Sequence, residues 1–310
     1  MFALIAAFLL AIITFIFAAG FGVWTAYPEV APTPVELPAT VIAEPTGSSA
    51  APWLVDPTWL RANLHDPNLR IIALMPKDDY DKGHIPGAVQ VDYPQLDLGD
   101  TSPAALAAWE ASMDKLIGSL GITVDSTVVV YDNGTHYAPR FWWVLAERSH
   151  PKPVGVLDGG LAAWQTVSDQ VETTAPVLPP ASAYTGTTDN AVLATKEQVV
   201  AALNHPDVVI VDARTAKEYA GGHIPGAINI PFLANYASGP NGGLLPVNEL
   251  TKLYVDAGIT PDKQVIVYCS TGVRASSDVF ALLWLGYPSV RNYTGAWAEW
   301  SADTSLPVEK

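Results

Sequence analysis

The feature that most constrains the fold is that the second half of the sequence repeats the first. Three pairs of segments match: KGHIPGAVQVDY (82–93) with GGHIPGAINIPF (221–232), GITVDSTVVVYD (121–132) with GITPDKQVIVYC (258–269), and DGGLAAW (158–164) with TGAWAEW (294–300). The pairs occur in the same order, at nearly constant separations of 139, 137 and 136 residues. Ordered matches at an almost fixed separation indicate a tandem duplication of one domain of about 120 residues.

Each half combines short apolar runs with segments of helical spacing. Four runs have the length and composition of strands buried on both faces: LRIIALM (69–75), STVVVYD (126–132), DVVIVDA (207–213) and KQVIVYC (263–269). The second run of each half precedes a helical pattern, in RFWWVLAER (140–148) and in SSDVFALLWLGY (276–287). Alternating strands and helices predict an α/β fold, each domain a mostly parallel sheet with helices on both faces.

The repeats and the composition divide the chain after its N-terminal part. We place a first domain at 52–168, a second domain at 191–310, and a linker rich in Thr, Pro, Ala and Ser at 169–190. Ligands of parallel sheets bind beyond the carboxyl ends of the strands, and Cys269 lies at one such end. We therefore expect the functional site there.

The N-terminus differs from the rest of the chain. Phe2 to Trp24 is a run without a charged residue that is long enough to span a bilayer, and a proline-rich stretch follows at 26–51. Residues 1–25 are predicted to be a signal anchor or a signal peptide, because Ala18-Ala19-Gly20 also resembles a cleavage site. The two alternatives predict a membrane-anchored or an exported protein, with its soluble domains on the extracytoplasmic side. An uncleaved anchor would contact the membrane through the N-terminal helix.

Charge and cysteine content exclude several classes of function. The net charge of −15 disfavours nucleic acid as a partner, and any anion site has to be built locally. A single cysteine excludes an intramolecular disulfide and a cysteine-only metal site. The sequence contains no Cys/His cluster and no glycine-rich nucleotide loop, so we predict neither a metal nor an organic cofactor.

The segment around that cysteine is unusual. Cys269 ends a predicted strand, and Ser270, Thr271, Gly272, Val273 and Arg274 lead into a predicted helix that starts near Ala275. Backbone N–H groups in such a turn converge on a small anion site, and the helix dipole and Arg274 add positive potential. Each effect favours thiolate over thiol. A lone cysteine is often only a small buried hydrophobe, but this loop predicts a nucleophile at Cys269 and substrate binding by residues 270–274.

These motifs resemble a known family. Cys-x-x-Gly-x-Arg after a strand, with GHIPGA about 45 residues upstream, is similar to the rhodanese sulfurtransferases. The duplication, YDNGTHYAPRFWW (131–143) and VLDGGLAAW (156–164) resemble the tandem-domain thiosulfate and 3-mercaptopyruvate enzymes over residues 52–303. The resemblance implies ping-pong transfer: the Cys269 thiolate takes the outer sulfur of a small anionic donor, and cyanide or a thiol then removes it.

The resemblance also assigns roles to other residues. Asp132 stands where Cys269 stands in the second half, so the first domain is expected to be non-catalytic and to wall a cleft between the halves. His84 and His223 are expected to be structural, because the GHIPGA motif occurs in both halves. Asp212 and Arg214 occur in the second half only, and either support the site or form a buried ion pair that serves the fold.

Some residues depart from the family pattern. Tandem thiosulfate enzymes usually carry a substrate-binding arginine where this chain has Glu218, before Tyr219, and Arg274 stands at the loop's end where they often have threonine. Thr271 replaces a serine of the mercaptopyruvate enzymes. We expect thiosulfate as the donor, with 3-mercaptopyruvate as the alternative. Two further alternatives are a membrane-tethered persulfide carrier for a partner protein and a phosphatase or arsenate reductase, which would need Cys-x5-Arg where this loop is Cys-x4-Arg.

Overall fold

A computed structural model describes residues 53–178, 180–239 and 242–310 of the chain. The predicted signal segment at 1–25 and the proline-rich linker at 26–51 lie outside these residues. Within the part that is described, none of the helices is both long enough and apolar enough to cross a membrane. Membrane anchoring or export therefore stays a prediction from the sequence.

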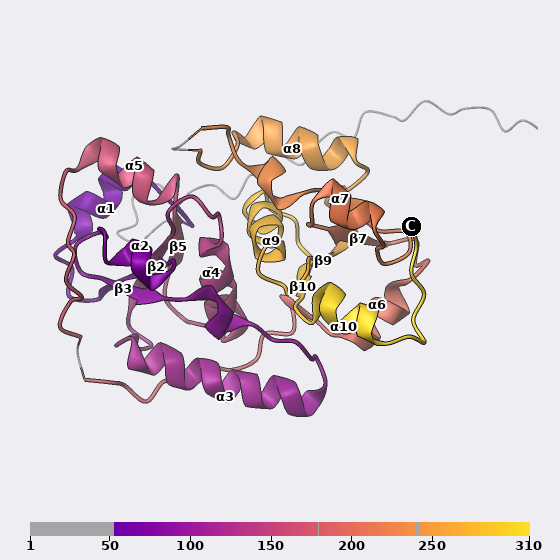
Figure 1. The fold of residues 1–310 in the computed structure, drawn as a ribbon, viewed down its shortest axis with the longest axis horizontal. Coiled ribbons are helices and arrows are strands. Elements are labelled where there is room, and N and C mark those ends of the chain that lie inside the picture. Colours follow the sequence, from indigo (N-terminus) through magenta and orange to yellow (C-terminus); the bar gives the residue numbers. More distant parts are fainter. Residues whose placement is uncertain (1–52, 179, 240–241) are drawn as a thin grey trace, which may run out of the picture. The chain divides into compact units, whose positions relative to one another are not determined.

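The first domain is built on a five-stranded sheet in the order β1-β5-β4-β2-β3, and all of its strand pairs are parallel. Its strands are β1 (Leu54–Val55), β2 (Leu69–Leu74), β3 (Ala88–Val91), β4 (Thr127–Tyr131) and β5 (Val154–Leu157). Its helices are α1 (Pro57–Asn63), α2 (Lys77–Tyr80), α3 (Pro103–Ser119), α4 (Ala138–Glu147) and α5 (Gly160–Val167), with a short 3₁₀ helix η1 (Tyr93–Leu96) (Figure 1).

The second domain repeats this arrangement with a sheet in the order β6-β10-β9-β7-β8, again parallel throughout. Its strands are β6 (Leu193–Ala194), β7 (Val208–Asp212), β8 (Ile228–Asn229), β9 (Gln264–Tyr268) and β10 (Val290–Tyr293). Its helices are α6 (Lys196–Ala202), α7 (Ala216–Ala220), α8 (Val247–Asp256), α9 (Ala275–Trp284) and α10 (Ala296–Ala302), with a 3₁₀ helix η2 (Phe232–Asn235). The identical strand order in both sheets confirms the predicted duplication of a parallel α/β domain.

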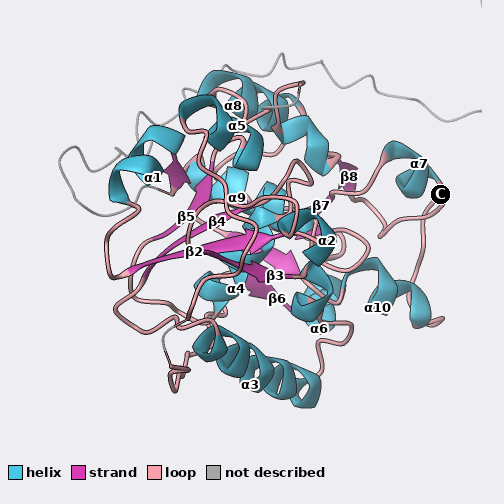
Figure 2. Ribbon diagram, turned by 60° about the vertical axis from the view of Figure 1, so that its left-hand side comes forward, coloured by secondary structure: helices cyan, strands magenta, loops and turns pink. Residues whose placement is uncertain are grey.

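Helices cover both faces of each sheet, because successive side chains of a strand point to opposite faces. In β2, Ile72 and Leu74 pack with the core that α3 and α4 cover, whereas Ile71 and Ala73 pack with the core under α1, α2 and α5. In the second domain, Val265 of β9 faces α8 and α9, and Ile266 faces α6 and α10. Figure 2 shows the magenta strands enclosed by cyan helices.

One hydrophobic core continues from the first domain into the second through α4 and α9. The rings of Trp142 in α4 and Phe280 in α9 meet edge to face with centroids 5.0 Å apart. Ser277 of α9 donates from Oγ to the carbonyl oxygen of His136, just before α4, at 2.7 Å. Both helices start at the carboxyl end of a central strand, β4 or β9. Their packing therefore places the two strand-to-helix loops against one another.

The predicted linker is not extended away from the first domain but lies along it. Glu172 and His84 form an antiparallel bridge, and the Ser182 N–H donates to the Gly118 carbonyl oxygen at 3.0 Å. His84 Nδ1 lies 2.9 Å from the Tyr80 carbonyl oxygen and stacks on the Tyr80 ring, and His223 repeats this with Tyr219 at 3.1 Å. The same bonds in both halves agree with a structural role for the two histidines.

Candidate active site

Cys269 follows β9 directly and lies at the base of the loop that leads into α9. Its side chain is 1% exposed, and the Gly272 N–H donates to its Sγ at 3.1 Å. Thr271 is exposed, and Ser270 and Arg274 are half-buried. Polar side chains of the loop therefore reach solvent, whereas the Cys269 sulfur is buried. One N–H group of the expected anion site is thus directed at the sulfur.

Gly272 is required in this loop for two reasons. Its φ of +85° lies in the left-handed region, and a Cβ there would meet Thr294 Oγ1 at 2.6 Å and the Thr294 Cα at 2.8 Å. The Gly272 carbonyl oxygen accepts from Asn292 Nδ2 at 3.0 Å and from Ser276 Oγ at 3.1 Å. The loop therefore packs closely against the end of β10. This packing fixes the position of the Gly272 N–H that donates to the Cys269 sulfur.

The first carbonyls of the loop are held by the start of α10. The Trp297 N–H donates to the Cys269 carbonyl oxygen at 2.9 Å, and the Ala298 N–H donates to the Ser270 carbonyl oxygen at 3.1 Å. The Trp297 ring in turn lies 4.5 Å from the guanidinium carbon of Arg214, within the range of a cation–π contact. Arg214 therefore contacts α10, the helix whose Trp297 N–H binds the Cys269 carbonyl oxygen.

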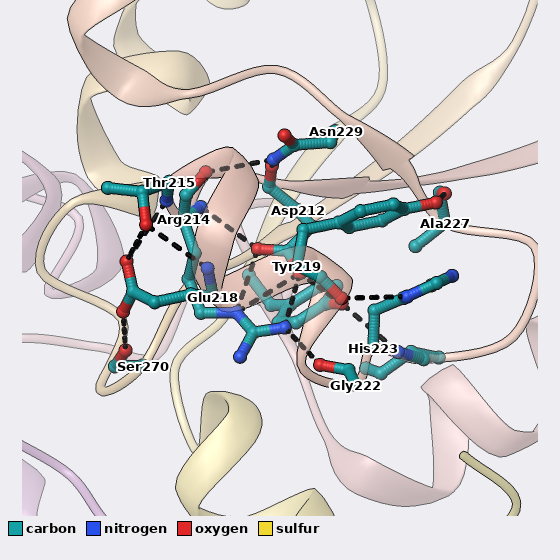
Figure 3. Close-up of polar contacts among 12 residues, drawn as sticks. Asp212, Arg214, Thr215, Glu218, Tyr219, Gly222, His223, Ala227, Asn229 and Ser270 are labelled. Atoms are coloured by element: carbon teal, nitrogen blue, oxygen red, sulfur yellow. Dashed lines mark hydrogen bonds and ion pairs between the residues drawn. The ribbon is translucent and has the colours of Figure 1, made fainter. Parts of the chain in front are cut away.

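Arg214 and Asp212 form the buried ion pair that the sequence left as one of two alternatives. Arg214 Nη2 lies 2.6 Å from Asp212 Oδ2, and Nε lies 3.0 Å from each carboxylate oxygen. The Tyr268 hydroxyl donates to the same carboxylate at 2.6 Å, and Arg214 Nη2 also donates to the Gly222 carbonyl oxygen at 2.7 Å. Figure 3 shows the contacts of Arg214 with Asp212 and with Gly222. The structure shows the buried ion pair and its contact with Trp297, and support of the site by this pair stays a prediction.

Arg274 does not extend toward open solvent. Its Nη1 and Nη2 donate to the two carboxylate oxygens of Glu218 at 2.9 and 2.8 Å, and Nη2 also donates to Ser270 Oγ at 2.6 Å. This bidentate pair holds the pKa of Glu218 far below its usual range. The hydrogen-bonded Glu218 also raises the pKa of Arg274, despite the opposing effect of burial, and the nearby Cys269 adds to the rise. Both shifts favour the charged forms of the pair.

The family described as Rhodanese-like domain matches residues 56–166 and 195–303, which together are most of the chain. The chain belongs to the rhodanese family. Among its relatives is a thiosulfate sulfurtransferase of Pseudomonas aeruginosa, 34% identical over 270 residues that cover 84% of this chain and 98% of that protein. A 3-mercaptopyruvate sulfurtransferase of Escherichia coli is 34% identical over 280 residues, covering 83% of this chain and 98% of the relative.

Two further similarities bear on the rhodanese site. The sulfur carrier protein TtuD of Thermus thermophilus is 34% identical over 281 residues, covering 83% of this chain and 96% of TtuD. The crystal structure of SseA from Escherichia coli, described as a rhodanese fold of 3-mercaptopyruvate enzymes, superposes with a TM-score of 0.70 at 33% identity. It covers 80% of this chain, and 99% of SseA is matched. The relatives support sulfur transfer and leave the donor open between thiosulfate and 3-mercaptopyruvate.

The first rhodanese domain has a carboxylate where the second has its thiol. Asp132 Oδ1 accepts from the Gly134 N–H at 2.9 Å, and Oδ2 accepts from the Ala138 N–H at 2.8 Å, so the carboxylate fills its own anion site. Asp158 nearby accepts from the Leu244 N–H of the second domain at 2.8 Å. A cavity of about 30 Å³ lies beside Asp132. The non-catalytic role of the first domain stays a prediction from the sequence.

The first domain also contributes side chains near Cys269 that the sequence did not single out. Burial raises the pKa of Tyr137, Arg274 lowers it, and Cys269 adds a small rise, which places the phenol within electrostatic range of both. The Tyr137 ring lies 6.0 Å from the ring of Phe232, over which the Arg274 guanidinium lies at 5.9 Å. Tyr137 and Phe232 are therefore candidates for the walls of the approach to the loop.

Arg140 is the second cation near the site. It is completely buried, it donates to the Leu96 carbonyl oxygen, and its guanidinium lies 4.7 Å from the Trp143 ring. Burial lowers the pKa of Arg140 to about 10, and negative charge at Asp97 and Cys269 opposes that change. The sequence signal for Tyr137 and Arg140 was their place in the segment 131–143, five and eight residues beyond Asp132, the position that matches Cys269.

Proposed function

We propose that this chain moves sulfane sulfur from thiosulfate to a thiophilic acceptor through a persulfide on Cys269. The observation that carries the proposal is the position of the only cysteine of the chain at the carboxyl end of β9, with the Gly272 N–H 3.1 Å from its Sγ. An N–H group directed at sulfur stabilises negative charge on it, and the thiolate is the form of cysteine that attacks.

The first half-reaction loads the sulfur. The Cys269 thiolate attacks the outer sulfur of thiosulfate, a new S–S bond forms, and the bond to the inner sulfur breaks with its electron pair. Sulfite leaves, and the terminal persulfide sulfur carries the negative charge. The loop from Ser270 to Arg274 surrounds this position, with the N-terminus of α9 and the charge of Arg274 beside it.

The second half-reaction unloads it. Cyanide or a thiolate attacks the terminal sulfur, the S–S bond to Cys269 breaks, and the Cys269 thiolate is regenerated. Cyanide leaves as thiocyanate, whereas a thiol acceptor leaves as its own persulfide. The two half-reactions share one covalent intermediate, so the kinetics are expected to be ping-pong.

Thiosulfate is the favoured donor because the one arginine of the loop already holds a carboxylate. Arg274 uses both of its terminal nitrogens on Glu218, so a donor that depends on a free guanidinium fork for its own carboxylate finds none there. Thiosulfate can be held by backbone N–H groups of the loop and by the N-terminus of α9. The similarity to a thiosulfate sulfurtransferase of Pseudomonas aeruginosa supports the same choice.

A second candidate is a persulfide carrier that hands sulfur to a partner protein. The similarity to the sulfur carrier TtuD supports it, and the uncharged N-terminal run would tether such a carrier to a membrane. The loop chemistry would be the same in both cases. The two differ in their acceptor: a carrier turns over poorly with cyanide or small thiols and well with its partner.

The deciding experiment measures thiocyanate formation from cyanide, with thiosulfate and 3-mercaptopyruvate compared side by side. Turnover that favours thiosulfate supports the proposal. A preference for 3-mercaptopyruvate would reject the donor assignment and leave persulfide chemistry intact. A folded protein that gains one sulfur atom by mass but forms no thiocyanate would favour the carrier, and one that gains no sulfur from either donor would refute sulfur transfer through Cys269.

A further inference from the structure

The Glu218 carboxylate accepts hydrogen bonds both from its own helix and from the Cys269 loop. It accepts from the Thr215 N–H at 3.0 Å, from Thr215 Oγ1 at 2.7 Å and from Ser270 Oγ at 3.2 Å. It also accepts both bonds from Arg274, at 2.9 and 2.8 Å. The contacts with Thr215 and Ser270 can be followed in Figure 3.

Local structure fixes the position of this carboxylate. Thr215 is the N-cap of α7, and Glu218 is the third residue of the helix, so the two side chains form a reciprocal capping box. The carboxylate is therefore held in place by its own helix, independently of Arg274. It presents its remaining hydrogen-bonding capacity to the loop that follows Cys269.

The contact between Glu218 and Arg274 has the geometry of substrate recognition. A guanidinium binds a carboxylate through two parallel N–H···O bonds, and arginine is used for carboxylate substrates because of that fork. Here the fork is filled by a carboxylate of the protein itself. The Arg274 side chain is 17% exposed, and the Phe232 ring lies 5.9 Å from its guanidinium carbon, so little of the cation remains open to a ligand.

We propose that Glu218 is a specificity-determining residue that occupies the place of a substrate carboxylate on Arg274 and so selects against carboxylate-bearing sulfur donors. The disfavoured class is the thiol-substituted 2-oxo acids, of which 3-mercaptopyruvate is the probe. Such a donor must displace Glu218 from Arg274 or bind without the fork, whereas thiosulfate brings no carboxylate. The inference rests on the proposed function and assigns the basis of its donor preference.

The test is the substitution Glu218→Gln in the full chain, assayed with both donors and cyanide. The amide keeps the size of the side chain and removes the charge that holds Arg274, so the fork becomes available. We expect the KM for 3-mercaptopyruvate to fall by about tenfold or more, the order expected for hydrogen bonds to a charged group. The KM for thiosulfate should change less, so the ratio of the two kcat/KM values should shift toward 3-mercaptopyruvate.

Two variants identify the cause. Glu249→Gln removes the same charge from an exposed side chain at the start of α8, and should leave the ratio of the two kcat/KM values unchanged. Glu218→Gln combined with Arg274→Met removes the freed fork, so the gain for 3-mercaptopyruvate should disappear. Should Glu218→Gln fold poorly, Glu218→Asp keeps the charge but is one methylene shorter, and should give a smaller change in the same direction.

Three results would overturn the assignment. The first is a ratio of the two kcat/KM values in Glu218→Gln equal to that of the wild type. The second is a lowered KM for 3-mercaptopyruvate that persists in the double variant. The third is loss of turnover with both donors at an unchanged thermal midpoint. The last result would make Glu218 a positioning residue of the loop rather than a selector of donors. Failure of the proposed function is distinct from all three, because it appears in the wild-type protein as the absence of a sulfur adduct with either donor.

Discussion

Gly272→Ala is the substitution whose cost the structure defines most directly. The residue has a φ of +85°, which costs a residue with a Cβ about 1 kcal/mol. The added methyl carbon would also lie 2.6 Å from Thr294 Oγ1, 2.8 Å from the Thr294 Cα and 2.9 Å from the Thr294 carbonyl oxygen. Two of these atoms belong to the backbone, so a rotation of the Thr294 side chain does not remove the clash.

Gly258→Ala is the matched control. Gly258 follows α8 with a φ of +78°, and nothing lies within 4 Å of the Cβ position. It therefore carries the same backbone strain of about 1 kcal/mol without the steric overlap. Overpacking in a dense interior adds about 1–3 kcal/mol, so Gly272→Ala should lower the free energy of unfolding by about 2–4 kcal/mol in total.

Urea unfolding of both variants measures the difference, and mass spectrometry after exposure to thiosulfate measures sulfur loading. Gly272→Ala should unfold at the lower urea concentration and should load less sulfur, because the loop must shift and the Gly272 N–H then leaves the Cys269 sulfur. Gly258→Ala should load sulfur as the wild type does. Equal midpoints for the two variants, or full loading of a destabilised Gly272→Ala, would refute the argument that close packing on Thr294 sets the loop.

Four further outcomes are expected. Cys269→Ser should abolish the sulfur adduct, and an adduct retained in this variant would remove Cys269 from the mechanism. Arg214→Met should lower the free energy of unfolding by about 3–5 kcal/mol in urea, because it leaves a buried carboxylate without its cation; a cost below 1 kcal/mol would contradict this. Asp132→Ala should keep kcat, and a collapse of kcat at unchanged stability would make the first domain a participant. Burial raises the pKa of Asp278 to about 8, so the folded protein keeps a proton that the unfolded chain, at the ordinary value of 3.8, has lost. Asp278 should therefore make the free energy of unfolding fall as the pH rises from about 4 to 8, by at most about 1.4 kcal/mol per pH unit. Asp278→Asn should flatten that slope when unfolding by urea is measured at several pH values. An unchanged slope would refute the role of Asp278.

The architecture could be predicted because its signals are local. The apolar runs at 69–75 and 263–269 correspond to β2 (Leu69–Leu74) and β9 (Gln264–Tyr268) within one residue at each end. The helix expected at 140–148 begins two residues earlier, at Ala138, because Pro139 is favourable in a first helical turn. Because the two halves are duplicated, the fold expected for the first domain is also expected for the second. The roles of Cys269 and of the loop remain predictions, which the geometry accommodates.

The sequence could not predict the partner of Arg274. Sequence reasoning included Arg274 among the substrate-binding residues, whereas in the structure its guanidinium holds Glu218, which is 56 residues away. Pairing across that distance depends on how β7 and β9 lie side by side, and no local pattern records it. A signal was nevertheless present, because Glu218 had already been identified as a departure from the tandem enzymes.

The contribution of the first domain follows from the surroundings of α9. Every residue from Ala275 to Leu282 in this helix is buried, so the helix has no face that could be left to solvent. Part of that burial comes from the first domain, through Trp142 against Phe280 and through the bond from Ser277 to the carbonyl oxygen of His136. The loop that carries Cys269 opens this helix, so its position depends on the domain that has no thiol. The first domain therefore contributes to the position of the loop that bears Cys269.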